Sequence, residues 1–181
     1  MADRFTEHRQ RLAEQIGETG IAFVPASAEA VRNDDVHHEF RQDSNFVYLT
    51  GFEEPDAVAV IAPGHPDGEY VLFVRPRDPE MEAWNGYRAG VEGARERFGA
   101  DAAHEIDRLD EVVPRMMLGR TELWYRTGDA RHDGRITGLL GKARAYRDRY
   151  GKPAPEGIRD ISAVIGEMRL IKSAEEMESM R

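Results

Sequence analysis

The sequence predicts an α/β fold with a mixed sheet of about six strands and helices on both faces. Three short apolar segments lie in the first half of the chain, at 21–24, 46–49 and 57–62. The turn-rich segment 63–68 then leads into a further predicted strand at 69–75, which is apolar from Tyr70 to Val74, and the two strands predict an antiparallel hairpin. Strand-like and helix-like segments alternate in the second half, and this pattern is typical of a sheet covered on both faces.

The chain opens with a predicted amphipathic helix. Phe5 and Leu12 belong to an apolar series at helical spacing, and the helix is expected to run from about Asp3 to Gly17. Asp3 and Thr6 are both suitable N-cap residues, because their side-chain oxygens can accept a free backbone N–H of the first turn.

The segment 41–58, RQDSNFVYLTGFEEPDAV, carries the densest pattern in the chain. Residues 46–49 are apolar or aromatic at every position, which predicts a central strand buried on both faces. Gly51 can adopt backbone angles closed to other residues and Pro55 cannot continue a ladder of hydrogen bonds, so we expect a turn here. A second buried strand is expected to follow the turn.

Further elements are predicted in the second half from apolar spacing and capping residues. The predicted helices are one that begins at Pro79, three at 91–98, 109–117 and 131–150, and one capped by Asp160. The predicted strands lie near 104–106 and at 123–125. Pro114 is compatible with its helix if Asp110 is the cap, because its missing N–H would then be an unpaired one. The strand at 123–125 is expected to be the last, and 151–157 to be a loop.

A domain boundary is expected near the C-terminus. Ser173 and Glu176 form an S-x-x-E capping box, which predicts a new helix from Ala174 onward. A helix shorter than about 12 residues is marginal in water. We therefore predict one domain over 1–172, and that 173–181 begins a helix leading into a further domain.

Composition and charge exclude several classes of protein. The chain has 181 residues, 40% hydrophobic and 33% charged, which is ordinary for one globular domain. It has no cysteine, which excludes disulfides and thiol nucleophiles, and no apolar run of the roughly 20 residues that cross a bilayer. The net charge of −9 argues against nucleic-acid binding, and the basic segment 131–149 is expected to be a solvated helix face. We expect a cytoplasmic protein with no membrane partner.

No catalytic or metal-binding motif is found in the sequence. His37 and His38 are adjacent on an extended segment, so their side chains point to opposite faces and cannot hold one ion together. No G-x-G-x-x-G, phosphate-loop or G-x-S-x-G pattern occurs. We predict no catalytic residue, no metal ligand and no cofactor in this chain.

Three motifs together resemble the N-terminal domain of the Xaa-Pro aminopeptidases, in the creatinase/prolidase/aminopeptidase P family. They are the pattern over 41–58, Trp84 with Gly86, and EMRLIKS at 167–173. The resemblance implies a ribonuclease-H-like arrangement, the creatinase N-terminal domain type. It also implies a C-terminal "pita-bread" metallopeptidase domain that holds two divalent metal ions, expected to be manganese, on ligands outside this chain.

The function that the resemblance implies is release of the N-terminal residue from peptides with proline in second position. This chain is expected to be inactive alone, to shape the substrate cleft beside its own C-terminal catalytic domain, and to hold subunits in a homo-oligomer. Two alternatives remain open at this stage. One is the N-terminal domain of a prolidase or creatinase, and the other is a free-standing protein-interaction module.

Two residues are candidates for contact with the peptide substrate. Trp84 lies in a glycine-rich, charged region where its large ring has no periodic apolar partners, although a role as a local packing anchor is equally open. The resemblance implies that a tryptophan at this place reaches toward the cleft of a neighbouring subunit. It also implies that Asp35 lies near the interdomain cleft; the alternative is a solvated loop acid beside Asp34.

Overall fold

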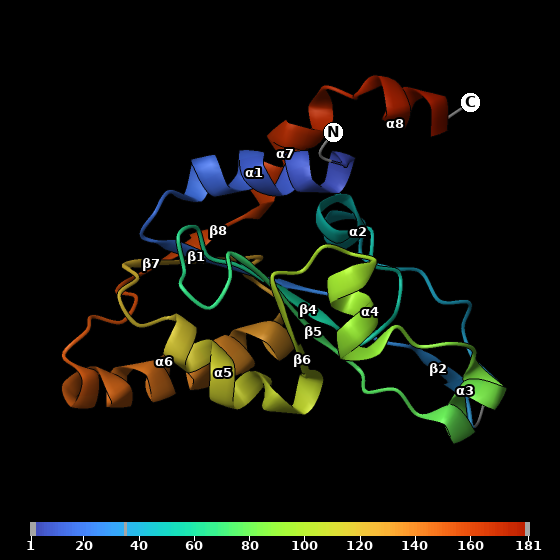
Figure 1. Cartoon of the computed structure of the whole chain (residues 1–181), viewed down its shortest axis with the longest axis horizontal. Helices are drawn as coiled ribbons and strands as arrows, with labels where there is room; N and C mark the ends of the chain where they lie inside the picture. The colour runs from blue at the N-terminus through green and yellow to red at the C-terminus, as the bar shows by residue number, and fades with distance from the viewer. Residues whose placement is uncertain (1–2, 35, 180–181) are drawn as a thin grey trace.

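The computed structural model describes residues 3–34 and 36–179, and Figure 1 shows their arrangement. The helices are α1 Arg4–Ile16, α2 Ser44–Thr50, α3 Pro79–Asn85, α4 Gly90–Glu96, α5 Leu109–Met116, α6 Ala130–Tyr150, α7 Ser162–Leu170 and α8 Ala174–Ser179, with a 3-10 turn at Ile106–Arg108. The strands are β1 Gly20–Pro25, β2 Val31–Asn33, β3 Val36–His37, β4 Val58–Ile61, β5 Tyr70–Val74, β6 Ala102–Glu105, β7 Glu122–Tyr125 and β8 Gly157–Asp160.

The central sheet has six strands in the order β6-β5-β4-β1-β7-β8. Strand β4 is antiparallel to both of its neighbours, β1 and β5, whereas the pairs β1–β7, β5–β6 and β7–β8 are parallel. The predicted mixed sheet is therefore confirmed. The predicted hairpin is confirmed as well, with Val58 opposite Phe73 and Ile61 opposite Tyr70.

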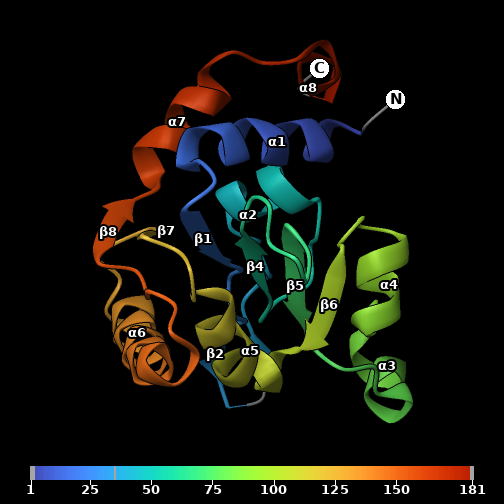
Figure 2. The ribbon, with the colours of Figure 1, turned by 60° about the vertical axis from the view of Figure 1, so that its left-hand side comes forward.

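Helices cover both faces of the sheet, as predicted (Figure 2). Helices α1, α2, α4 and α7 pack on one face, and α5 and α6 pack on the other. Successive side chains of a strand point to opposite faces, so Ala22 and Val24 belong to the first core whereas Ile21 and Phe23 belong to the second. Burial on both faces explains why the central strands are apolar at nearly every position.

The strand predicted at 46–49 is wrong, because these residues lie in helix α2. Asp43 caps this helix: its carboxylate accepts the N–H groups of Asn45 and Phe46, both at 2.9 Å. Gly51 ends the helix in the left-handed conformation, with φ of 65°, and its N–H donates to the Val47 carbonyl. The special backbone angles expected of Gly51 are thus observed, but at a helix C-terminus instead of a strand end.

Strand β8, which forms an edge of the sheet beside β7, is not predicted from the sequence. Three of its four residues are exposed, so the segment has none of the apolar pattern by which a strand is recognised. The predicted count of about six strands is therefore correct although one member is different. The small hairpin of β2 and β3, which pairs Val31 with His37, was not predicted either.

Most of the predicted helices are observed close to their expected bounds. Asp3, and not Thr6, caps α1, because the Thr6 N–H donates to Asp3 Oδ1 at 2.7 Å. The basic segment 131–149 lies in α6, which buries an apolar row that includes Ile136 and Leu139. The predicted capping box at the start of α8 is present: Ser173 N–H donates to Glu176, and Glu176 N–H donates to Ser173.

Helix α5 begins one residue before the expected cap, so Asp110 lies inside it and Pro114 occupies the sixth position. Without an N–H, Pro114 leaves the carbonyl oxygen of Asp110 without its usual helical partner. The ammonium group of Lys142, on α6, donates to this carbonyl at 3.3 Å and to Asp110 Oδ2 at 3.0 Å. A contact between helices therefore replaces the missing helical hydrogen bond.

The carboxylate of Asp160 joins the end of β8, the loop after β7 and the start of α7. The N-cap of α7 is Ile161, one residue after the predicted cap Asp160, and Asp160 Oδ1 accepts the Ser162 N–H at 2.7 Å at the start of this helix. Its Oδ2 accepts the hydroxyl and the N–H of Thr127, at 2.6 and 3.0 Å. Hydrogen bonds from Thr127 and Ser162 stabilise the charged form and lower the pKa of Asp160 to about 2.

We expect the replacement Asp160→Asn to destabilise the domain by about 1 kcal/mol near neutral pH, the usual size of a lost capping interaction. Because the pKa of Asp160 is lower in the folded chain than its ordinary value of 3.8, its contribution is present above that value and is lost as the pH falls through about 2. Urea unfolding of both forms between about pH 2 and pH 6 measures this. A difference in unfolding free energy that stays constant over this range would contradict the assignment.

Candidate functional site

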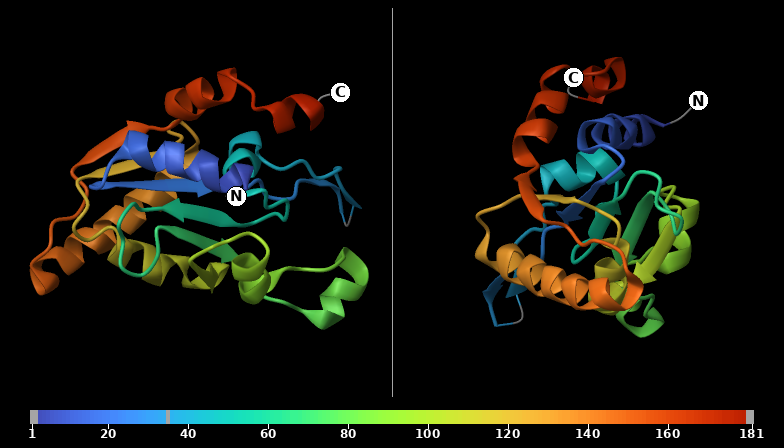
Figure 3. Two further views of the ribbon diagram at one scale, coloured as in Figure 1. Left: turned by 45° about the horizontal axis from the view of Figure 1, so that its top comes forward. Right: turned by 90° about the vertical axis from the view of Figure 1, so that its left-hand side faces the viewer.

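Two segments project from the same end of the molecule, far from the C-terminal half of α6 (Figure 1). One is the β2–β3 hairpin and the other is helix α3 with the loops on either side of it. Figure 3 shows them as separate projections, not as one packed unit. We call this region the projecting end.

A bidentate ion pair joins helix α3 to the segment that precedes it. Arg77 Nε and Nη2 donate to the two carboxylate oxygens of Glu82 at 3.1 and 3.0 Å, and the Arg77 guanidinium lies 5.0 Å from the centre of the Tyr87 ring. The hydrogen bond between Arg77 and Glu82 raises the pKa of Arg77 and lowers the pKa of Glu82. Pro79 occupies the first helical position, as predicted.

The return of the chain from α3 is also fixed. Glu54 Oε1 accepts the N–H of Ala89 at 2.7 Å, which ties the loop to the turn after α2. Gly90 follows with φ of 62°, and a Cβ there would lie 2.5 Å from Arg77 Cγ. A residue with a side chain would be strained at this position by the backbone angle, and it would require the Arg77 side chain to move. The scaffold thus holds α3 outward by specific contacts.

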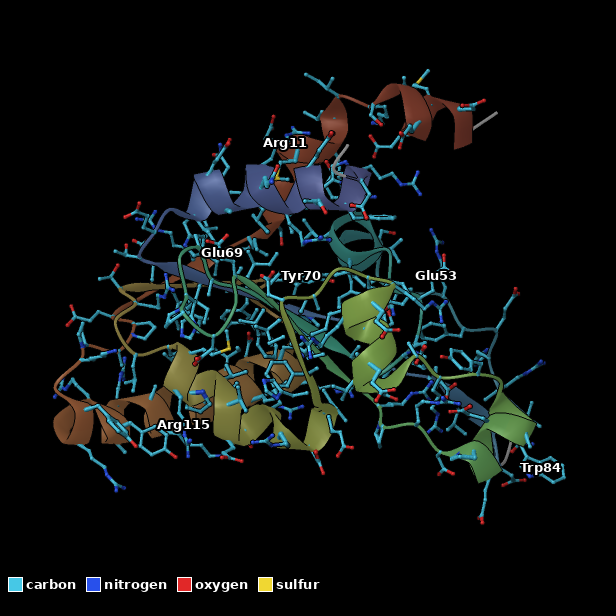
Figure 4. The ribbon with its side chains drawn as sticks, in the orientation of Figure 1. Arg11, Glu53, Glu69, Tyr70, Trp84 and Arg115 are labelled. Atoms are coloured by element: carbon cyan, nitrogen blue, oxygen red, sulfur yellow. The ribbon has the colours of Figure 1, made fainter. Side chains whose placement is uncertain are left out.

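Trp84 lies on the projecting helix with its side chain pointing away from the body of the protein (Figure 4). Its relative exposure is 86%, so the alternative that Trp84 is a local packing anchor is wrong. An exposed ring of this size is typical of contact surfaces, because burying it against a partner releases much apolar area from water. Val31 and Val36, in the β2–β3 hairpin of the same projecting end, are exposed as well.

Asp35, the second candidate, lies outside the described residues. Its neighbour Asp34 is exposed and has a positive φ of 44°, which marks a tight turn between β2 and β3. The structure therefore brings the segments that carry both candidates to one end of the molecule.

A second feature, which we call the linker groove, is a hollow of about 850 Å³ between the N-terminal half of α1, helix α2, the segment 40–42 and the α7–α8 region. Phe5, Phe40 and Val47 contribute apolar surface to it. Tyr48 forms part of its wall, and its ring stacks on His8 with the ring centres 3.7 Å apart. The groove is therefore built on a well-packed base.

The linker groove was not identified from the sequence, although a signal for it was present. Two of the three motifs that carry the family resemblance meet here, since both 41–48 and 169–172 contribute to its lining. Arg169 joins them directly by donating to Asn45 Oδ1 at 2.6 Å. When family motifs that are far apart in the sequence line one surface, that surface is expected to have a role shared by the family.

Neither surface offers the ligand set of a metal centre. Within 3–34 and 36–179, no three histidine, aspartate or glutamate side chains come together so that they could hold a metal ion. The described residues thus do not fit a pair of bound metal ions. The resemblance places the ligands of the two metal ions outside this chain. Among the same residues, no helix combines the length and apolar character needed to cross a bilayer.

Comparison with known proteins gives a consistent result. The family described as "Aminopeptidase P, N-terminal domain" matches residues 5–125. The Xaa-Pro aminopeptidase of Haemophilus influenzae is 33% identical over 99% of this chain, which spans 39% of that protein. The structure of Pseudomonas aeruginosa aminopeptidase PepP superimposes with a TM-score of 0.92 at 40% identity, over 97% of this chain and 40% of that chain. A relative from Arabidopsis thaliana, named intermediate cleaving peptidase 55, mitochondrial, is 30% identical over 99% of this chain and 34% of its own length.

Proposed function

We propose, because this chain belongs to the aminopeptidase P N-terminal domain family, that it is the non-catalytic N-terminal domain of a proline-specific metalloaminopeptidase. The parent enzyme would release the N-terminal residue from Xaa-Pro peptides. The relatives named Xaa-Pro aminopeptidase support this substrate class. They favour it over a prolidase or a creatinase, which remain the alternative within the family.

The catalytic part of the parent would lie after residue 172. This chain spans about 40% of the length of the bacterial relatives that it matches, so the larger part of those proteins has no counterpart here. We assign the two divalent metal ions, expected to be manganese, to that larger part. They would supply the activated water for peptide hydrolysis, and no step of the reaction is assigned to a side chain of this domain.

The role of this domain would be to shape the substrate cleft and to hold subunits together. The observation that carries this proposal is the exposure of Trp84 on a helix that specific contacts hold away from the core. We propose that Trp84 contacts the peptide in the cleft of a neighbouring subunit, and that Asp35 lies near the cleft of its own subunit. The enzyme would therefore be a homo-oligomer.

The proposal is tested with the product of the complete reading frame that contains this chain. It should be assayed with manganese against an Xaa-Pro dipeptide, longer peptides with proline in second position, and creatine. Hydrolysis of longer peptides indicates an aminopeptidase, and hydrolysis of dipeptides alone indicates a prolidase. A reading frame that stops after Arg181 would favour the remaining alternative, a free-standing interaction module.

We propose a cytoplasmic location for the parent enzyme. The Arabidopsis relative named as mitochondrial shows that the family is also found in an organelle. Cell fractionation with an antibody against this domain would distinguish the two compartments.

A further inference from the structure

We infer that the linker groove is the docking site of the domain that follows in the parent enzyme. The surface of that domain that binds in the groove would be apolar with an acidic rim. The inference rests on the proposed function, because it requires a parent enzyme with a following domain. It adds where that domain docks and what chemistry the docking surface has. Three features of the groove support it: its apolar lining, its charge and its position on the path of the chain.

The apolar lining of the groove continues onto exposed residues. Phe5, Phe40 and Val47 line it and are only partly buried. Leu170, also in the lining, is 64% exposed, and the adjacent Ile171 is 81% exposed. Contiguous apolar surface of this kind is uncommon on a protein that has no partner. These side chains would be removed from water by a docked surface.

The charge of the groove differs in sign from the charge of the whole chain. Its charged lining, besides His8, consists of four basic and two acidic side chains: Arg4, Arg41, Arg169, Lys172, Glu53 and Glu176. The formal charge of this set is therefore +2, whereas the chain carries −9. Glu176 already accepts the Ser173 N–H at 2.8 Å, which reduces its capacity to pair with the basic residues. An acidic rim on the partner would complement this lining.

The path of the chain places the following polypeptide at the groove. The Met168 carbonyl accepts hydrogen bonds from the Tyr48 hydroxyl at 3.2 Å and from Arg11 Nη2 at 3.4 Å, which fixes the end of α7. Beyond Leu170 the chain leaves the body, and α8 stands above α2 (Figure 1). This chain spans about 40% of the length of the bacterial relatives, and in the proposed parent the remaining part would follow α7 and α8 along this path.

Hydrogen–deuterium exchange of the full-length parent and of the isolated chain tests the inference. We expect the amides of segments 40–48 and 166–172 to exchange at least roughly tenfold more slowly in the parent, because burial of one large apolar side chain is worth about this factor or more. Exchange of β8, which lies outside the groove, should be the same in both proteins. Equal exchange of the groove segments in both would overturn the inference.

The replacement Leu170→Glu provides the matched test, because it puts an acidic group where an acidic partner is expected. It should abolish the added protection in the parent and leave exchange in the isolated chain unchanged. The control is Ile158→Glu, at an apolar residue that is 50% exposed on β8, and it should change exchange of the groove segments in neither protein.

A parent that is an active aminopeptidase but has an unprotected groove would overturn this inference and leave the proposed function intact. An inactive parent would overturn the proposed function instead. Protection that appears in the isolated chain as its concentration rises would identify a second copy as the occupant and overturn the inference.

Discussion

Replacing Trp84 with alanine in the full-length enzyme is expected to lower kcat/KM for Xaa-Pro peptides roughly ten- to a hundredfold, the factor expected when burial of one large apolar side chain is lost. The free energy of unfolding should be unchanged, because the Trp84 side chain is 86% exposed. Steady-state kinetics with an Xaa-Pro-containing peptide measures the first quantity, and urea unfolding measures the second.

Two controls separate a role in the cleft from a general effect. The replacement Ile158→Ala removes another exposed apolar side chain, at the sheet edge, and should leave kcat/KM unchanged. Mixed oligomers of the Trp84→Ala subunit and a subunit that has Trp84 but an inactivated catalytic half test action between subunits. If Trp84 acts in the cleft of the neighbouring subunit, the mixed oligomers should be more active than the homo-oligomer of either subunit. Full activity of the Trp84→Ala homo-oligomer would refute a substrate role.

The largest loss of stability is expected for Phe52→Ala, at about 3–5 kcal/mol, the usual cost of truncating a buried aromatic residue. Phe52 is fully buried, and its ring packs edge to face against Phe46 and Phe98 with ring centres 6.3 and 4.8 Å apart. This cluster joins α2, the turn that follows it and the turn after α4. Urea unfolding of the isolated chain, followed by circular dichroism, measures the effect.

The control for Phe52→Ala is Val36→Ala, at an apolar residue of the β2–β3 hairpin that is 51% exposed. It should change the free energy of unfolding by less than about 0.5 kcal/mol, as is usual for exposed positions. A loss below about 1 kcal/mol for Phe52→Ala would show that the cluster does not hold α2 and α4 together, because a truncated core aromatic otherwise costs more.

The elements that could be predicted from the sequence are those with apolar residues repeated at helical spacing or with a segment rich in turn-forming residues. Helices α1 and α6 have apolar residues at helical spacing, and the β4–β5 hairpin has apolar runs on both sides of a turn rich in proline and glycine. The segment 46–49 was misjudged because four consecutive apolar residues fit a buried strand and a buried helix equally well. Asp43 and Gly51, which cap α2 at its two ends, were the signals that favoured a helix.

Other features depend on packing and have no local signal. Strand β8 has an exposed edge pattern, so only its pairing with β7 reveals it. The linker groove is formed by segments near positions 4–8, 40–53 and 166–176, whose proximity is fixed by the contacts of α1, α2 and α7. The sequence indicated that Trp84 lacks apolar partners, but its exposure and its place on a projecting helix required the structure.

The central claim is that this domain assists a reaction whose catalytic residues lie elsewhere in the parent enzyme. The most direct measurement compares the purified isolated chain with the full-length parent on an Xaa-Pro dipeptide in the presence of manganese. The account predicts turnover by the parent and no turnover above a buffer blank by the isolated chain. Hydrolysis by the isolated chain that follows its concentration and survives repeated purification would contradict the account.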